Sequence, residues 1–188
     1  MTTEQRLPTK AELLEALQSS GREVIDRVRA MSPDEFERGR YENGWNARQI
    51  LAHIASIEWT YPRLVDLARE GTPAEAQQQQ PEVRRTEPEE APGVPTRPMQ
   101  GGVDSYNERQ VAKRAGASVA ELLAEFERNR AATITAVEEA DEELLRTHIR
   151  SAGGVTGPLA GVIQAVAVQH VLGHLGDIVR SELTEQRW

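Results

Sequence analysis

The chain has 188 residues, the size of one ordinary domain, which is enough to bury about two-thirds of the surface that the unfolded chain exposes. Its formal net charge of -8, with arginines and glutamates interleaved at helical spacing, argues against binding to nucleic acid. No cysteine is present, which excludes disulfides and thiolate ligands. We find neither a secretion signal nor a membrane span, and we expect a single cytoplasmic domain over residues 1–188.

The first predicted helix covers about residues 10–31. Thr9 and Glu12 form a capping-box pattern, and apolar residues then recur at helical intervals up to Met31. A second start signal surrounds Pro33, where proline at the first helical position predicts a short helical turn.

The second long helix is predicted over about residues 46–70. Asn46 is its expected cap, and apolar residues at helical spacing give it a buried face. Pro62 falls inside this range and removes one backbone donor. The sequence therefore predicts either a kink near Glu58 or an early end of the helix.

Residues 71–103 differ in composition from the rest of the chain. Six of the ten prolines lie there, together with four consecutive glutamines and few large apolar residues. We expect a long crossover loop between the second and third helices, acting either as a lid or as a mobile connection. A loop of this length suits two helices that run parallel in a bundle.

The C-terminal half is again helical in pattern. A third helix is predicted over about 104–139, broken near Gly116, and a short turn over 141–146. Glycines at 153–157 then lead into a last helix of about 158–184 that is apolar on almost every side. We expect this helix to be buried all round, either at the bundle centre or shared with a second subunit. With no strand pattern in the chain, the predicted fold is an all-α four-helix bundle.

Three of the four histidines fall inside predicted helices. His170 and His174 are one turn apart, so both rings can reach one ion at about 2.0–2.1 Å. The apolar stripe around this pair, and the isoleucines flanking His53, predict that all three rings point inward. Helices in a bundle approach to about 8–10 Å, so His53 can complete a metal site begun by the other two. Such a site would leave coordination positions open.

The alternatives to a metal site stay open at this point. An HxxxH spacing arises by chance in roughly 6% of chains with this histidine content, and a lone inward histidine is more often a hydrogen-bonded core residue than a ligand. His148 lies near a turn and has no predicted role.

Three further residues are considered for the site. Asp177 follows His174 by three residues, and it could orient an imidazole, act as a fourth ligand, or simply complement Arg180. Glu58 is a weaker hypothesis for a general base, and an exposed helix face explains it equally well. Trp45 could line the mouth of the site, although a tryptophan just before a helix more often packs as a hydrophobic staple.

Two motifs resemble those of a known family. Segment 44–53, GWNARQILAH, resembles the signature around the first ligand in the DinB-like superfamily, which includes mycothiol-dependent maleylpyruvate isomerases, and HVLGHLGDI at 170–178 resembles its closing HxxxH motif. DSYNER at 104–109 is similar to the start of the third helix in one branch. The resemblance implies an up-down-down-up four-helix bundle, often dimeric, that holds nickel, zinc or a similar divalent ion on His53, His170 and His174.

The resemblance also implies chemistry. Characterised members transfer a low-molecular-weight thiol such as mycothiol, or use it as a cofactor in isomerisation. The isomerases have a glutamate where this chain has His170, and they carry a second domain that we do not find in this sequence. We therefore predict a metal-dependent thiol S-transferase or related detoxifying enzyme, acting on a small-molecule electrophile and a thiol. The alternatives are a metal-dependent hydrolase or self-resistance protein, and a non-catalytic metal-binding stress protein.

Overall fold

A computed structural model describes residues 6–41, 44–71 and 102–180. The predicted all-α class is confirmed, because nearly every regular element within these residues is helical. The elements in chain order are α1 (Lys10–Arg29), α2 (Pro33–Phe36), α3 (Ala47–Glu58), α4 (Tyr61–Arg69), α5 (Gly102–Lys113), α6 (Val119–Glu139), η2 (Leu144–Arg146), β1 (His148–Arg150), β2 (Thr156–Pro158), α7 (Leu159–Ile163), η3 (Gln164–Gln169) and α8 (His170–Val179). Most of the predicted crossover loop, and the end of the predicted last helix, lie outside the described residues.

The helices begin where capping residues satisfy the first free amide groups. The side chains of Thr9, Asn46 and Ser118 each accept a hydrogen bond from the backbone N–H three residues on, and the side chain at that third position bonds back to the cap. These reciprocal bonds satisfy two donors that a helix would otherwise leave unpaired. The predicted starts of α1, α3 and α6 are therefore confirmed.

The second predicted helix is two helices in the structure. α3 ends at Glu58 and α4 begins at Tyr61, so the break falls at Trp59 and Thr60. Pro62 lies in the first turn of α4, where its missing N–H costs nothing. The break predicted from the proline is thus present, and it gives α4 a start of its own.

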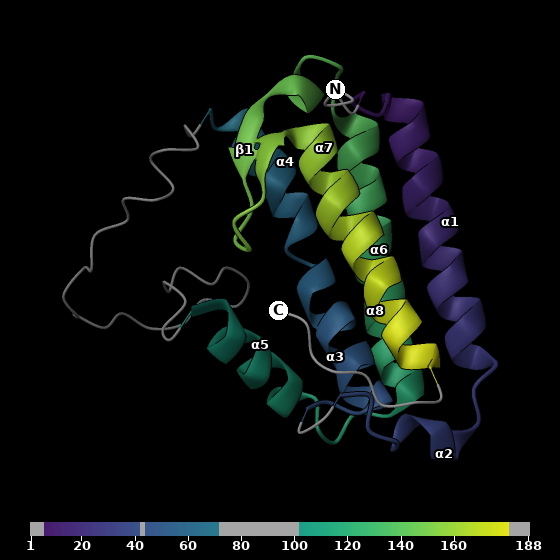
Figure 1. The fold of residues 1–188 in the computed structure, drawn as a ribbon. Helices are drawn as coiled ribbons and strands as arrows, with labels where there is room; N and C mark the ends of the chain where they lie inside the picture. Colours follow the sequence, from purple (N-terminus) through teal and green to yellow (C-terminus); the bar gives the residue numbers. More distant parts are fainter. Residues whose placement is uncertain (1–5, 42–43, 72–101, 181–188) are drawn as a thin grey trace, which may run out of the picture.

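Four helical rods pack together along their lengths. α3 packs against both α6 and α8, and α1 packs against the same two helices. Figure 1 shows α1, α3, α6 and α8 side by side, with the β1–β2 hairpin at one end of the assembly and α2 at the opposite end. α5 packs against α3.

The interior has two apolar clusters separated by a polar level. One cluster is built around Leu17, Leu159 and Ile163, near the hairpin, and the other around Phe126 and Ile54, toward α2. The buried polar residues between them come from helices α1, α3 and α6: Ser20, Glu58, Arg130 and Thr133. Arg130 and Glu58 form an ion pair with Nε and Oε1 2.7 Å apart, and Thr133 also contacts the Glu58 carboxylate. Pairing of this kind is what makes buried charge tolerable.

Two features differ from the sequence prediction. β1 and β2 form an antiparallel hairpin, with His148 opposite Pro158 and Arg150 opposite Thr156, whereas no strand was expected. Gly154 makes the turn with a φ of 89°, which a side chain would oppose. The prediction failed because three-residue strands are too short to show an alternating pattern.

The last helix is not buried on all sides. Gln169, His170 and Gly173 are exposed, and only the opposite face, including Val171 and Leu175, enters the core. The prediction was wrong because glycine and alanine make this outer face look apolar by composition although it packs against nothing in the described chain.

The segment Leu159–Val179 has a mean hydropathy of 1.3 and is long and apolar enough to cross a membrane by these two measures alone. The same property is expected of a core helix in a bundle. Since α7, η3 and α8 pack against the other three rods, the core explanation accounts for it.

Candidate metal centre

The three histidines predicted to converge do lie together. α3 contributes His53 and α8 contributes His170 and His174, and one ring nitrogen from each lies within 4.8 Å of the other two. The ring centroids of His170 and His174 are 4.5 Å apart, and that of His53 is 5.7 Å and 4.9 Å from them. Packing of α3 against α8 brings the two motifs to one place, although 116 residues separate His53 from the closest member of the pair along the chain (residues 53 and 170, with 54–169 between).

The closest contact within the group joins two Nε2 atoms. Those of His170 and His174 are 3.0 Å apart. Two nitrogens bound to one zinc-like ion at about 2.0–2.1 Å would be about 3.3 Å apart in a tetrahedral site. The helical i,i+4 pair therefore already has the spacing of a chelating pair.

The three rings differ in exposure to solvent. His53 is 3% exposed, His174 is half-buried, and His170 is exposed. The expectation that all three point inward thus holds for His53 only. Because α8 presents its outer face to solvent at His170, a small molecule can approach the group from that side.

Burial keeps these imidazoles neutral. Desolvation, with smaller contributions from the other two rings, lowers the pKa of His53 to about 3. Desolvation, followed by the effect of His170, lowers the pKa of His174 to about 4, although Asp177 acts in the opposite direction. Desolvation also lowers the pKa of His170, offset by a hydrogen bond to the Val166 backbone. Neutral imidazole is the form that binds metal ions.

The surroundings of His53 fit an ion. Its Nδ1 is buried and has no hydrogen-bond partner among the residues that the structure describes. A buried polar nitrogen without a partner is costly. Three neutral imidazoles, one of them with an unpaired buried nitrogen, form a donor set that can hold a divalent ion such as nickel or zinc.

Trp45 covers the buried side of the group. Its ring lies 5.1 Å from that of His53, centroid to centroid, and it also packs against the apolar cluster near α2. Both roles considered for it from the sequence, lining the site and packing at the helix start, are compatible with this position.

A tyrosine that the sequence did not single out completes the surroundings of His174. The hydroxyl of Tyr41 donates a hydrogen bond of 2.7 Å to Asp177 Oδ2 and lies 3.5 Å from His174 Nδ1. Asp177 Oδ2 is itself 3.7 Å from that nitrogen, and Asp177 Oδ1 is 3.7 Å from Arg180. Tyr41 and Asp177 together can hold the Nδ1 proton of His174, which leaves Nε2 free to face His170.

Tyr41 is fixed by its neighbours along the chain. The adjacent Arg40 is buried and donates from Nε to the Ile178 carbonyl at the end of α8, at 2.9 Å. Gly44 lies so close to Tyr41 that a Cβ on it would be 2.6 Å from the tyrosine Cβ. No local pattern marks Tyr41, and only the motif beginning at Gly44 could have pointed to this loop.

The structure places Glu58 outside the histidine group. Its side chain is fully buried and bound by Arg130 and Thr133, so the exposed helix face suggested for it is wrong. Desolvation raises the pKa of Glu58, and Arg130 opposes this shift. Its carboxylate serves the buried ion pair. His148 lies in the hairpin strand β1, exposed, as its lack of a predicted role suggested.

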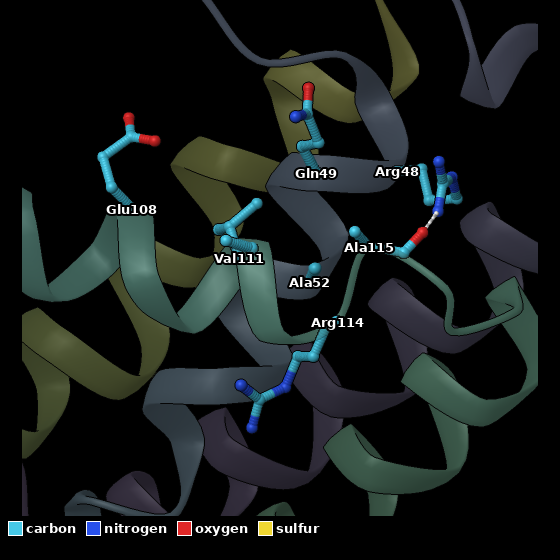
Figure 2. Close-up of a pocket in the computed structure, with 8 residues that line it drawn as sticks. Arg48, Gln49, Ala52, Glu108, Val111, Arg114 and Ala115 are labelled. Carbon is cyan, nitrogen blue, oxygen red and sulfur yellow. Dashed lines mark hydrogen bonds between the residues drawn. The ribbon is translucent and has the colours of Figure 1, made fainter.

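A small hollow lies between α3 and α5 (Figure 2). Its volume is about 110 Å³, and none of the three histidines is among its lining residues: Arg48, Gln49, Ala52, Glu108, Val111, Ala112, Arg114 and Ala115. Arg48 donates to the Ala115 carbonyl at 2.7 Å, and Arg114 pairs with Glu125. The two arginines of the hollow therefore hold α5 in place.

The fold and the histidine group define an all-α protein with the donor set of a metal site. A model of the DinB superfamily matches residues 40–178, and the chain belongs to that superfamily. The matched range starts just before Tyr41 and ends just after Asp177, so it includes every residue of the group described above.

Solved structures with the same fold exist. One is a crystal structure of the mycothiol-dependent maleylpyruvate isomerase, with a TM-score of 0.67 and 19% identity, covering 96% of this chain and 65% of that chain. Another is a histidine-to-alanine mutant of that isomerase, with a TM-score of 0.66 and 18% identity, covering 95% and 63%. The chain thus spans slightly less than two thirds of the length of these neighbours. No curated protein matches the chain.

Proposed function

We propose that the protein is a divalent-metal-dependent enzyme of the DinB superfamily, with His53, His170 and His174 as the ligands. The observation that carries this proposal is the convergence of three neutral imidazoles, each offering a nitrogen within 4.8 Å of the others, at a place open to solvent on one side. Three protein ligands leave coordination positions for another molecule, which is typical of catalytic and not of structural sites.

The proposed reaction is the addition of a low-molecular-weight thiol, such as mycothiol, to a small-molecule electrophile. Membership of the DinB superfamily and a fold shared with a mycothiol-dependent enzyme support this class. The absence of cysteine from the chain is consistent with it, because the reacting thiol then comes from a substrate. The presence of His170, which the sequence comparison sets against a glutamate in the isomerases, favours a transferase over an isomerase.

A bound divalent ion would act as a Lewis acid that favours the thiolate form of an incoming thiol. The chain's own residues prepare the place for it. Tyr41 and Asp177 hold the proton of His174 on Nδ1, and Trp45 shields the ring of His53 from water. The exposed side at His170 is where thiol and electrophile would enter.

We further propose that residues 1–188 form one domain with the up-down-down-up topology of a four-helix bundle, with its long crossover between α4 and α5. The packing of α1, α3, α6 and α8 supports this arrangement. We also propose that the protein forms a homodimer and acts in the cytoplasm, without nucleic acid or membrane partners.

The first experiment is metal analysis of the purified protein. We expect about one nickel, zinc or similar ion per chain, retained by His148→Ala and lost by His170→Ala. The two variants remove the same ring, one from the hairpin and one from the histidine group. A wild type without stoichiometric metal, or full retention by His170→Ala, would contradict the site.

The second experiment tests the reaction. Metal-loaded protein should conjugate monochlorobimane with mycothiol, and chelation of the metal should abolish turnover. Metal-dependent consumption of an electrophile without any thiol would indicate the hydrolase or self-resistance alternative instead. A protein that is metal-loaded and inert with every thiol and electrophile would support a non-catalytic metal-binding role.

A further inference from the structure

The helix that carries His170 and His174 changes its hydrogen-bonding register just before the first of them. Segment η3, Gln164–Gln169, is π-helical, and the His170 backbone N–H bonds to the carbonyl of Ala165, five residues back. From His170 onward the helix is α again. Short π segments inside α-helices are rare and are found mostly at functional sites.

This change of register sets one carbonyl apart. When a helix returns from i−5 to i−4 bonding, the backbone passes over one carbonyl oxygen. The last π bond ends on Ala165, so the carbonyl next in line is that of Val166. The hydroxyl of Tyr61, from the start of α4, donates to this oxygen at 2.7 Å. A carbonyl oxygen has two lone pairs, so a second donor can share it.

The second donor is the ring of His170. One of its nitrogens hydrogen-bonds to the Val166 backbone. Its Nε2 is turned the other way, 3.0 Å from Nε2 of His174. The nitrogen beside the carbonyl is therefore Nδ1, and a proton on Nδ1 leaves the lone pair of Nε2 directed at the centre of the histidine group.

We propose that Tyr61 is a positioning residue for the metal site, which holds the Val166 carbonyl where it fixes His170 in the Nδ1–H tautomer. The proposal rests on the metal site proposed above. It also explains the short contact between the pair. With the proton of His174 on Nδ1 as well, two lone pairs face each other across 3.0 Å. That arrangement is repulsive unless a cation lies between the two nitrogens.

The position of Tyr61 is determined by the break between α3 and α4. Tyr61 is the first residue of α4, immediately before Pro62, and is 4% exposed. An uninterrupted helix would turn this side chain to a different direction. Arg130 holds the neighbouring carbonyl, that of Ala167, at 2.8 Å, so the buried ion pair and Tyr61 act on successive residues of the π segment.

The test is the protonation state of His170 in the metal-free protein, read from ring nitrogens by long-range ¹H–¹⁵N NMR. The wild type should show the Nδ1–H tautomer. Tyr61→Phe removes only the hydroxyl, and we expect His170 to become a mixture of tautomers. The matched control is Thr133→Val, which removes another buried hydroxyl from the same interior without touching Val166. It should leave the His170 tautomer unchanged even if it costs similar stability.

Metal affinity provides the second measurement. Loss of a group that orients a ligand typically weakens metal binding about 10–100-fold, and we expect about tenfold weaker zinc binding in Tyr61→Phe than in Thr133→Val. An Nε2–H tautomer in the wild type, or a Tyr61→Phe protein with an unchanged tautomer and unchanged zinc affinity, would overturn the inference. Failure of the wild type to bind zinc at all would overturn the metal site, whereas the tautomer of the metal-free protein judges the role of Tyr61 independently.

Discussion

His53 is kept neutral by a cost that the folded protein bears whenever protons are abundant. Its ring is buried beside Trp45 and two other imidazoles, and nothing acidic in the described chain contacts it. Protonation would place an unpaired charge in the interior, which is among the most destabilising changes in a protein. At this scale the site resembles a trap for a cation other than a proton.

The metal-free protein should therefore lose stability as the pH falls. The pKa of His53 is lowered from 6.5 to about 3, so between these values the unfolded chain binds a proton that the folded chain does not. Stability from this residue is complete above pH 6.5 and decreases as the pH falls toward 3. One pKa unit corresponds to 1.36 kcal/mol, so at pH 5 the loss from His53 is about 2 kcal/mol. Urea unfolding at pH 7.5 and 5 measures it.

The comparison needs variants, because carboxylates also titrate in this range. His53→Leu should show a smaller loss between the two pH values than wild type does. His148→Gln, which removes an exposed histidine in the hairpin, should behave as wild type. Equal pH dependence in all three proteins would contradict the assignment of the loss to His53.

The residues of the site differ in how far the sequence could predict them. The HxxxH spacing and the position of His53 in mid-helix suffice to select the three histidines. Tyr41 and Tyr61 act through contacts with residues 136 and 105 positions away, and no local pattern records such contacts. The buried Arg130 looks like any surface arginine of an amphipathic helix until the fold brings Glu58 to it.

At the scale of elements, the joints between helices carry the information that positions the site. The loop from α2 to α3 is short, and it places Tyr41 and Trp45 on either side of Gly44. Gly44 is exposed and has no left-handed backbone angle, so its lack of a side chain matters for space alone. Where Tyr41 sits thus depends on a hydrogen atom at the position of a Cβ.

Gly44→Ala should accordingly disturb the site from outside. An added Cβ would be 2.6 Å from the Cβ of Tyr41, so the tyrosine must move away from Asp177. We expect about tenfold weaker metal binding, measured by competition with a chelator. Gly116→Ala is the control, since a Cβ there meets nothing within 4 Å. Equal affinities in the two variants would show that Tyr41 tolerates the clash or does not support His174.

Element boundaries were predictable where a side chain announces them. The reciprocal caps at Thr9, Asn46 and Ser118 are local in sequence, and so is the proline that separates α3 from α4. The π segment was not predictable, because its sequence, QAVAVQ, is compatible with an α-helix and its register depends on donors from other helices. The hairpin was missed for want of length.

At the scale of the whole molecule, one face of the last rod is left uncovered. Val166, Gln169, Gly173 and Gly176 follow each other at helical spacing, and a Cβ on either glycine would meet nothing within 4 Å. Each glycine in a helix interior costs about 1 kcal/mol relative to alanine. A second copy of the chain that packs closely on this stripe would offset that cost.

We expect a dimer through this stripe. Light scattering at micromolar concentration should give twice the chain mass, and the melting temperature should rise with protein concentration. Gln169→Arg places a charge on the stripe and should shift the protein toward monomer. Gln18→Arg makes the same change at an exposed position of α1 and should not. A monomeric wild type, or equal effects of the two variants, would refute this interface.

The difference in exposure among the three histidines has a kinetic consequence. An ion leaving the site would lose its bond to His170 first, because only that ring meets solvent freely, and its bond to the enclosed His53 last. Capture would proceed in the reverse order along the same route. Loading and unloading thus have a single doorway, and a second subunit docked beside Gln169 would stand next to it, so the lifetime of the bound ion would depend on the concentration of the protein itself.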